Sequence, residues 1–103
     1  MMSVGAGDYY TLPELAFKLN VYKRDIYSLS ALGPGFEIMR IYVKPAYRYV
    51  VPRNQVYEWA RIVFADKNLK RAAKRISPHI LSGFVDYERR RDQRRINGKG
   101  VKN

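Results

Sequence analysis

Residues 11–32 of this chain read TLPELAFKLNVYKRDIYSLSAL, and this stretch decides the fold because it holds two short amphipathic patterns around a tight turn. Thr11 and Glu14 form a capping box, in which each side chain accepts a hydrogen bond from a free backbone N–H at a helix start. The apolar residues that follow recur at the spacing of one helix face, namely Leu12, Leu15, Ala16 and Leu19. The sequence therefore predicts a first helix.

A second helix is expected to begin near Tyr22 or Lys23, after a turn at Asn20, because Asn is one of the few non-glycine residues that tolerate a left-handed backbone. Its inner face would use Ile26, Leu29 and Leu32. Its solvent-facing side would carry Lys23, Arg24, Tyr27 and Ser28. The Gly-Pro-Gly sequence at residues 33–35 does not continue a helix. Two helices joined by a short turn outline a helix-turn-helix.

Downstream of this pair, residues 36–43 and 47–51 are rich in β-branched and aromatic side chains. They predict a β-hairpin whose tip, Lys44-Pro45-Ala46, is basic. Pro52 closes the second strand and suits the start of a helix. A third helix is then predicted from the apolar face formed by Val56, Trp59, Ala60 and Val63, with Trp59 read as a core residue.

The remaining chain predicts a basic helical extension. Leu69, Ala72, Ala73 and Ile76 form an amphipathic run, and Ser77-Pro78 resembles a break followed by a new helix cap. A last helix is expected from Pro78 through Arg95, with Gly83 as an unfavourable interior residue. The expected organisation is a flexible leader over residues 1–8, a folded domain over 9–65, the extension over 66–96 and a disordered tail over 97–103.

Composition narrows the class of partner. The 103 residues suffice for one folded unit, and 20 Lys and Arg against 9 Asp and Glu give a formal charge of +11, which points to a polyanion such as nucleic acid. Residues 1–65 hold eight basic and five acidic side chains, net +3, whereas residues 66–103 hold twelve and four, net +8. Most of the positive field is therefore expected from the extension.

The same composition argues against several chemistries. With no Cys and a single His79, neither a disulfide, a zinc site nor a conventional catalytic triad is expected. No pattern of nucleophile and general base is recognisable, so we expect no enzymatic activity, no cofactor and no metal. The chain lacks a long apolar run and the pattern of a signal peptide, so a cytoplasmic protein with no membrane association is expected.

The predicted order of elements over residues 10–63 resembles the excisionase-like, MerR-type winged-helix DNA-binding domains. Residues 11–16, TLPELA, match the family's opening helix, and residues 21–27, VYKRDIY, match its recognition-helix stretch. Residues 48–53, RYVVPR, through Trp59 resemble the exit from the wing and the following helix. The chain departs from the family at Asn20, where glycine is usual, and at Tyr22, where a Ser or Thr cap is common. The resemblance implies a mainly α fold with a small β-hairpin, a winged helix-turn-helix followed by C-terminal basic helices.

Candidate binding residues follow from the exposed positions. At the start of a recognition helix, basic and hydroxyl side chains can reach base edges in the major groove, which fits Lys23, Arg24, Tyr27 and Ser28. The resemblance implies that the wing meets the backbone or the minor groove, through Arg40, Lys44, Tyr47, Arg48 and Arg53. The alternative for the helix residues is an ordinary solvated face. The alternative for the hairpin residues is an exposed edge whose charges prevent aggregation.

Two basic clusters in the extension, residues 67–75 and 89–95, could supply phosphate contacts without sequence information. The candidate residues are Lys70, Arg71, Lys74, Arg75, Arg89, Arg90 and Arg91. The alternative is a solvated pair of amphipathic helices. An apolar stripe of Ile80, Leu81, Phe84 and Tyr87 could pack on the domain or on a second copy of the chain.

The resulting hypothesis is a non-enzymatic protein that binds double-stranded DNA with sequence preference, as a regulator of transcription or an excisionase-like factor. By resemblance alone, such a factor would come from a phage or another mobile element and would associate with the nucleoid. Two alternatives stay open. One is a small terminase-like packaging or assembly subunit that oligomerises through residues 66–95, and the other is a module whose basic surface binds an acidic protein.

Overall fold

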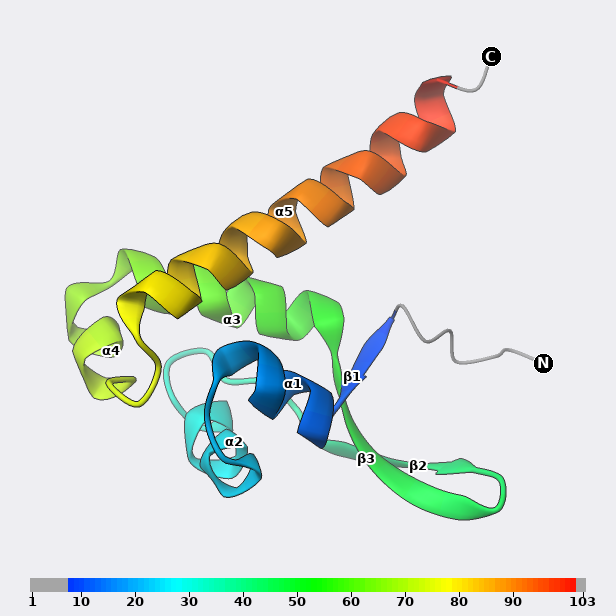
Figure 1. Ribbon diagram of the computed structural model, residues 1–103, viewed down its shortest axis with the longest axis horizontal. Coiled ribbons are helices and arrows are strands. Elements are labelled where there is room, and N and C mark those ends of the chain that lie inside the picture. Colours follow the sequence, from blue (N-terminus) through cyan, green and yellow to red (C-terminus); the bar gives the residue numbers. More distant parts are fainter. Residues whose placement is uncertain (1–7, 102–103) are drawn as a thin grey trace.

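Figure 1 shows the computed structural model, which describes the backbone of residues 8–101 and the side chains of residues 8–91. In chain order the elements are β1 (Tyr9–Thr11), α1 (Leu12–Leu19), α2 (Lys23–Ser30), β2 (Met39–Val43), β3 (Ala46–Pro52), α3 (Arg53–Ala65), α4 (Lys67–Ala72) and α5 (Pro78–Val101). The three strands form one antiparallel sheet in the order β1-β3-β2. The prediction of a mainly α fold with a small β-hairpin is therefore confirmed. Within the described residues, no helix is long and apolar enough to cross a membrane.

The first helix begins and ends as the sequence predicted. The Thr11 hydroxyl accepts a hydrogen bond from the backbone N–H of Glu14 at 3.2 Å, and the Glu14 carboxylate accepts one from the backbone N–H of Thr11 at 2.9 Å. Asn20 ends the helix with a left-handed backbone at φ 57°. The four apolar residues of the predicted face are all buried. This helix follows from local sequence alone.

The second helix is capped by Asp25, from within its own first turn. Tyr22 has no capping side chain, but the Asp25 carboxylate accepts a hydrogen bond from the backbone N–H of Tyr22 at 3.0 Å. The helix ends at Ser30, whose carbonyl accepts from the N–H of Phe36 at 3.0 Å. A Cβ at Gly35, where φ is +75°, would lie 2.7 Å from that carbonyl oxygen, so the loop requires glycine there.

The sheet contains one strand that was not predicted. Residues of β1 pair with β3 in the register Tyr9↔Pro52, Tyr10↔Val51 and Thr11↔Val50. The hairpin, which we define as β2, β3 and the two residues between them, was predicted, but β2 begins at Met39 rather than at residue 36. Phe36 is instead buried against Trp59, with ring centroids 5.2 Å apart. Its packing into the core takes it out of the strand.

The hydrophobic core extends from Tyr10 to Val85 and crosses the predicted domain boundary. Trp59 is fully buried at its centre, and its indole N–H donates to the carbonyl of Leu32 at 2.9 Å. The same cluster of buried side chains includes Ala73, Ile76, Leu81, Phe84 and Val85. Residues 66–91 are therefore part of the same hydrophobic core as residues 9–65, rather than an appendage to it.

The helices of the extension differ in length from the prediction. α4 ends at Ala72, short of the expected Ile76, whereas α5 continues past Arg95 to Val101, into the segment for which we expected disorder. Residues 102–103 lie outside the described residues, as does most of the predicted leader. Gly83 is exposed in α5, and a Cβ there would meet nothing within 4 Å, so no neighbouring group requires glycine at this position.

A buried polar cluster joins β1, α3 and α5. The Tyr10 hydroxyl donates to Glu88 Oε2, and Arg53 Nη2 donates to the same oxygen at 2.9 Å. The side chains of Arg53 and Glu88 are only 14% and 4% exposed. Burial and the hydrogen bond to Glu88 raise the pKa of Tyr10. Burial opposes the charge on Arg53, but the hydrogen bond and charge of Glu88 together with the neighbouring Tyr10 and Tyr87 outweigh it, so the pKa of Arg53 is raised.

The raised pKa of Tyr10 predicts a loss of stability at alkaline pH. The unfolded state ionises Tyr10 near pH 10 and the folded state does not, so the contribution of Tyr10 is complete below about pH 10 and falls above it, by up to about 1.4 kcal/mol per pH unit. Tyr10→Phe should reduce this alkaline slope in urea unfolding measured from about pH 8 to 11, whereas Tyr42→Phe, on the exposed hairpin, should leave it unchanged. The same slope in Tyr10→Phe and the unchanged protein would contradict the assignment.

Candidate nucleic-acid interface

The outer face of α2 carries basic and hydroxyl side chains and no exposed carboxylate. Lys23, Arg24, Tyr27 and Ser28 are all exposed, as the sequence predicted. The Arg24 guanidinium lies 4.8 Å from the centroid of the Tyr22 ring, which is itself 68% exposed. Asp25, the one acidic residue of the helix, is turned inward and only 6% exposed. The face that α2 offers to solvent is therefore favourable for a polyanion.

α4 contacts the loop that follows α2, and the link after α4 pairs with α2 itself. Arg75 Nη1 pairs with Asp25 Oδ1 at 3.2 Å, and the side chain of Leu69 packs on Gly33, where an added Cβ would lie 3.1 Å from Leu69 Cδ1. The candidates Arg71, Lys74 and Arg75 are exposed. Lys70 is half-buried, with its ammonium 4.5 Å from the Phe64 ring centroid. The structure thus brings two candidate groups, far apart in sequence, into one basic region.

The hairpin projects at the lower right of Figure 1, whereas α2 is at the lower left. Its candidates Arg40, Lys44, Tyr47 and Arg48 are all exposed. The register places Arg40 opposite Tyr49 and Tyr42 opposite Tyr47, with Lys44 and Pro45 at the tip. In Figure 1, α2 and the hairpin both lie along the lower side of the molecule, so one extended ligand could contact both.

Arg53 does not belong to this surface. Its guanidinium points into the core, where it pairs with Glu88 and lies 4.3 Å from the centroid of the Tyr10 ring. Its position next to the exit from the hairpin suggested a surface role, but its partners come from β1 and from α5. We therefore assign Arg53 to the stability of the fold.

The second basic cluster, residues 89–91, lies apart from α2 and the hairpin. The part of α5 that carries it is on the upper side of the molecule in Figure 1, away from the lower side formed by α2 and the hairpin. Arg89 and Arg90 both pair with Asp86, the latter at 3.1 Å. Arg91 is half-buried. The structure does not bring these residues together with the other candidates. Residues 92–95 of the cluster have side chains outside the described residues.

The apolar stripe of α5 packs mainly within the chain. Leu81 and Phe84 are buried in the core, and Ile80 packs against it. The Phe84 ring lies 6.1 Å from that of Tyr10. Tyr87 is half exposed, with the Lys18 ammonium 4.5 Å from its ring centroid. Of the two uses that the sequence left open for this stripe, packing on the domain accounts for most of its side chains.

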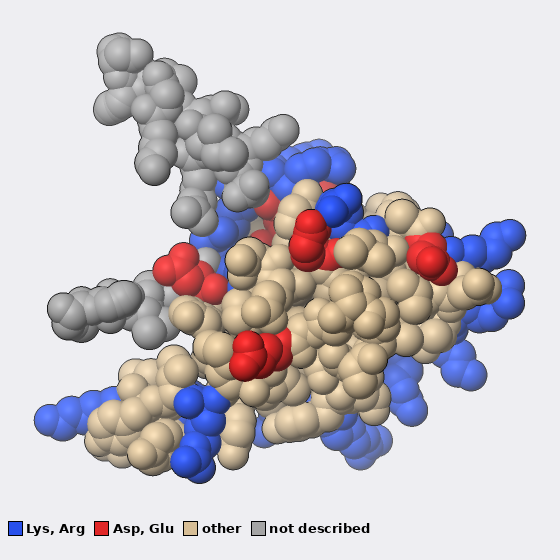
Figure 2. Space-filling view, turned by 180° about the vertical axis from the view of Figure 1, so that it is seen from behind, with Lys and Arg blue, Asp and Glu red and all other residues tan. Residues whose placement is uncertain are grey.

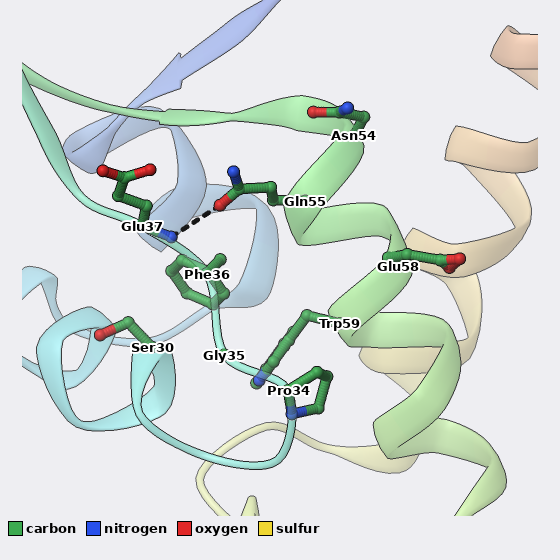
Figure 3. A pocket seen from close by; sticks show the side chains of 9 residues that line it. All are labelled: Ser30, Pro34, Gly35, Phe36, Glu37, Asn54, Gln55, Glu58 and Trp59. Atoms are coloured by element: carbon green, nitrogen blue, oxygen red, sulfur yellow. Dashed lines mark hydrogen bonds between the residues drawn. The ribbon is translucent and has the colours of Figure 1, made fainter.

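A hollow of about 580 Å³ between α3 and the loop after α2 has the wrong charge for an anion. Its charged lining residues are Glu37 and Glu58 (Figure 3). The backbone N–H of Glu37 donates to Gln55 at 2.8 Å, and Glu58 pairs with Arg61 at 2.7 Å. Figure 2 shows a face of the molecule with acidic and uncharged side chains over its middle and basic side chains mainly at its margins. This charge distribution makes neither the hollow nor the middle of that face a suitable site for nucleic acid.

The sequence analysis missed two exposed aromatic residues of the hairpin. Tyr42 is 58% exposed and Tyr49 is 49% exposed, close to the value of 59% for the predicted Tyr47. Both could have been predicted from the alternation of residues 40–49, since positions two apart in a strand share a face.

Comparison with protein families, curated proteins and solved structures found no match for this chain.

Proposed function

We propose that this protein binds double-stranded DNA without enzymatic activity, as a small winged-helix factor. The observation that carries the proposal is the outer face of α2, where Lys23, Arg24, Tyr27 and Ser28 are exposed while Asp25 is turned inward. A helix that enters the major groove needs side chains of this kind near its start, because Arg and Lys can donate to guanine and hydroxyl groups can reach bases or phosphates. An exposed carboxylate at the same place would be repelled by the phosphates.

The neighbouring basic side chains would supply the affinity that does not depend on sequence. Arg75 pairs with Asp25 of α2, and Arg71 and Lys74 are exposed close to Arg75 in the chain. Arg40, Lys44 and Arg48 lie on the hairpin, which would act as the wing along the backbone or the minor groove. Each neutralised phosphate releases counterions, so binding should weaken as salt rises. The resemblance to excisionase-like and MerR-type domains supports a regulator or an excisionase-like factor as the kind of protein.

Arg24→Ala should reduce the preference of the protein for its target over random DNA. If Arg24 makes a bidentate contact to a base, the loss of discrimination should be roughly 1–3 kcal/mol. The measurement is a mobility-shift titration of the unchanged protein against genomic fragments to find a target, followed by titrations of both proteins with target and random duplexes at several salt concentrations. An equal loss on both duplexes would make Arg24 a phosphate contact, and no loss on either would remove α2 from the interface.

Arg90→Ala is the matched control, because it removes the same charge from α5, which lies on the upper side of the molecule in Figure 1. It should change the affinity for either DNA by less than about twofold. A loss as large as that of Arg24→Ala would place the interface on α5 instead of α2. No binding of the unchanged protein to any duplex at about 50 mM salt, where phosphate contacts are strong, would refute the proposed function.

A further inference from the structure

One face of the hairpin is an ordered array of aromatic rings. Side chains alternate along a strand and paired residues of neighbouring strands share a face, so the register places Arg40, Tyr42, Tyr47 and Tyr49 together. The three rings are 58%, 59% and 49% exposed. The Tyr42 and Tyr47 rings meet edge to face with centroids 5.1 Å apart. The Arg40 guanidinium lies 4.4 Å from the centroid of the Tyr47 ring. Tyr42 and Tyr47 are held against each other, and all three rings still present their surface to solvent.

The charge around these rings favours a polyanionic ligand. The hairpin segment 39–52 contains Arg40, Lys44 and Arg48 and no acidic residue. Arg40 shares the face of the rings and Lys44 is at the tip, whereas Arg48, opposite Ile41, lies on the other face of the hairpin. In Figure 2, the hairpin at the lower left carries an uncharged surface bordered by basic side chains. Charges alone would suffice to protect a hairpin edge from aggregation, so the protective role leaves the three exposed rings unexplained. Rings interleaved with cations are the combination that binds single-stranded nucleic acid, since bases stack on the rings while phosphates meet the cations.

We propose that this face of the hairpin stacks unpaired bases, so that the protein prefers DNA in which unpaired bases adjoin a duplex. The proposal rests on the proposed function, because α2 would hold the duplex while Tyr42, Tyr47 and Tyr49 take bases from the opened strand. In a fully paired duplex the faces of the bases are covered by their neighbours, and the rings could contact only the groove edges and the backbone. Stacking on aromatic rings tolerates any sequence, because every base has a π face.

The test uses three DNAs of one sequence: a full duplex, the same duplex with about four mispaired bases at its centre, and a single strand. A 2-aminopurine in the mispaired segment reports stacking by its fluorescence. The unchanged protein should bind the mispaired duplex about tenfold more tightly than the full duplex and quench the probe. The double substitution Tyr42→Leu and Tyr49→Leu, at the two rings that are not candidates for duplex contact, should remove both effects and change binding to the full duplex by less than about twofold. Tyr42→Phe with Tyr49→Phe should retain both, because the rings remain.

The substitution of Lys44 and Arg48 by Ala provides the control for charge, and should weaken binding to the two duplexes by the same factor. Equal affinity of the unchanged protein for the two duplexes would overturn the inference and leave the proposed function intact. An equal loss on both duplexes in the Leu variant would also overturn the inference. So would an unchanged preference for mispaired DNA in that variant, which is the result expected if the rings bind a protein partner. Binding to single strands and mispaired DNA without binding to the full duplex would uphold the inference and refute the proposed duplex function. Binding to none of the three DNAs would refute both.

Discussion

Removal of residues 66–103 is expected to abolish cooperative folding. The removed segment supplies Ile76, Leu81, Phe84 and Val85 to the core, all of them 8% exposed or less. Full burial of one such side chain contributes about 1.5–3 kcal/mol, so the loss is of the order of the whole stability of a small domain, about 5–15 kcal/mol. The measurement is circular dichroism during thermal unfolding. The shortened chain should give no cooperative transition.

A shorter deletion serves as the control for this experiment. Removal of residues 92–103 leaves in place every side chain of the described core and should retain a cooperative melt. A folded fragment of residues 1–65 would show that the segment after Ala65 is an independent extension, as the sequence analysis expected. Because the deletion would remove the fold, the part that the extension takes in DNA binding has to be tested by single substitutions such as Lys74→Ala.

Glu88→Ala is expected to destabilise the protein by about 3–5 kcal/mol, because it leaves the buried guanidinium of Arg53 without its carboxylate and the Tyr10 hydroxyl without its acceptor. The measurement is the free energy of unfolding from urea titrations near pH 7. The combined substitution Arg53→Met and Glu88→Leu removes both charges and should recover most of the loss, since replacing a buried ion pair by apolar side chains is often neutral.

Glu58→Ala is the matched control, because Glu58 pairs with Arg61 on the surface, where its side chain is 54% exposed. It should change the stability little, since exposed ion pairs contribute little. If Glu88→Ala were as harmless as Glu58→Ala, the polar cluster would not stabilise the attachment of α5. A combined variant as unstable as Glu88→Ala would show that the space left by the pair cannot be filled by Met and Leu.

The parts of the fold that the sequence predicted are those specified by neighbouring residues. The capping box of Thr11 and Glu14, the left-handed Asn20 and the glycine turn after α2 all act within a few positions of one another. The exposed face of α2 follows from the same local period. These features require no knowledge of the rest of the chain.

The features that were missed depend on partners far away in the sequence. Arg53 was predicted to lie on the surface because it flanks the wing in the family that the chain resembles, whereas its carboxylate partner comes from α5. Asp25 pairs with Arg75 from the link after α4, and no local pattern predicts this pairing. The strand β1 is three residues long and exists through its pairing with β3, so no alternating pattern could reveal it. Periodicity predicts which face of an element is buried, but not which element covers it.

The ion pair between Arg75 and Asp25 joins the link after α4 to α2, so one guanidinium belongs both to the fold and to the basic region. The Asp25 side chain is 8% exposed and depends on Arg75 and on the N–H of Tyr22 for its partners, whereas the Arg75 side chain is 62% exposed. A phosphate that approaches Arg75 therefore competes with a buried carboxylate for the same guanidinium. Arg75 should contribute less to the affinity for a polyanion than the neighbouring Lys74, and its main effect is to keep the N-terminus of α2 docked while other side chains bind.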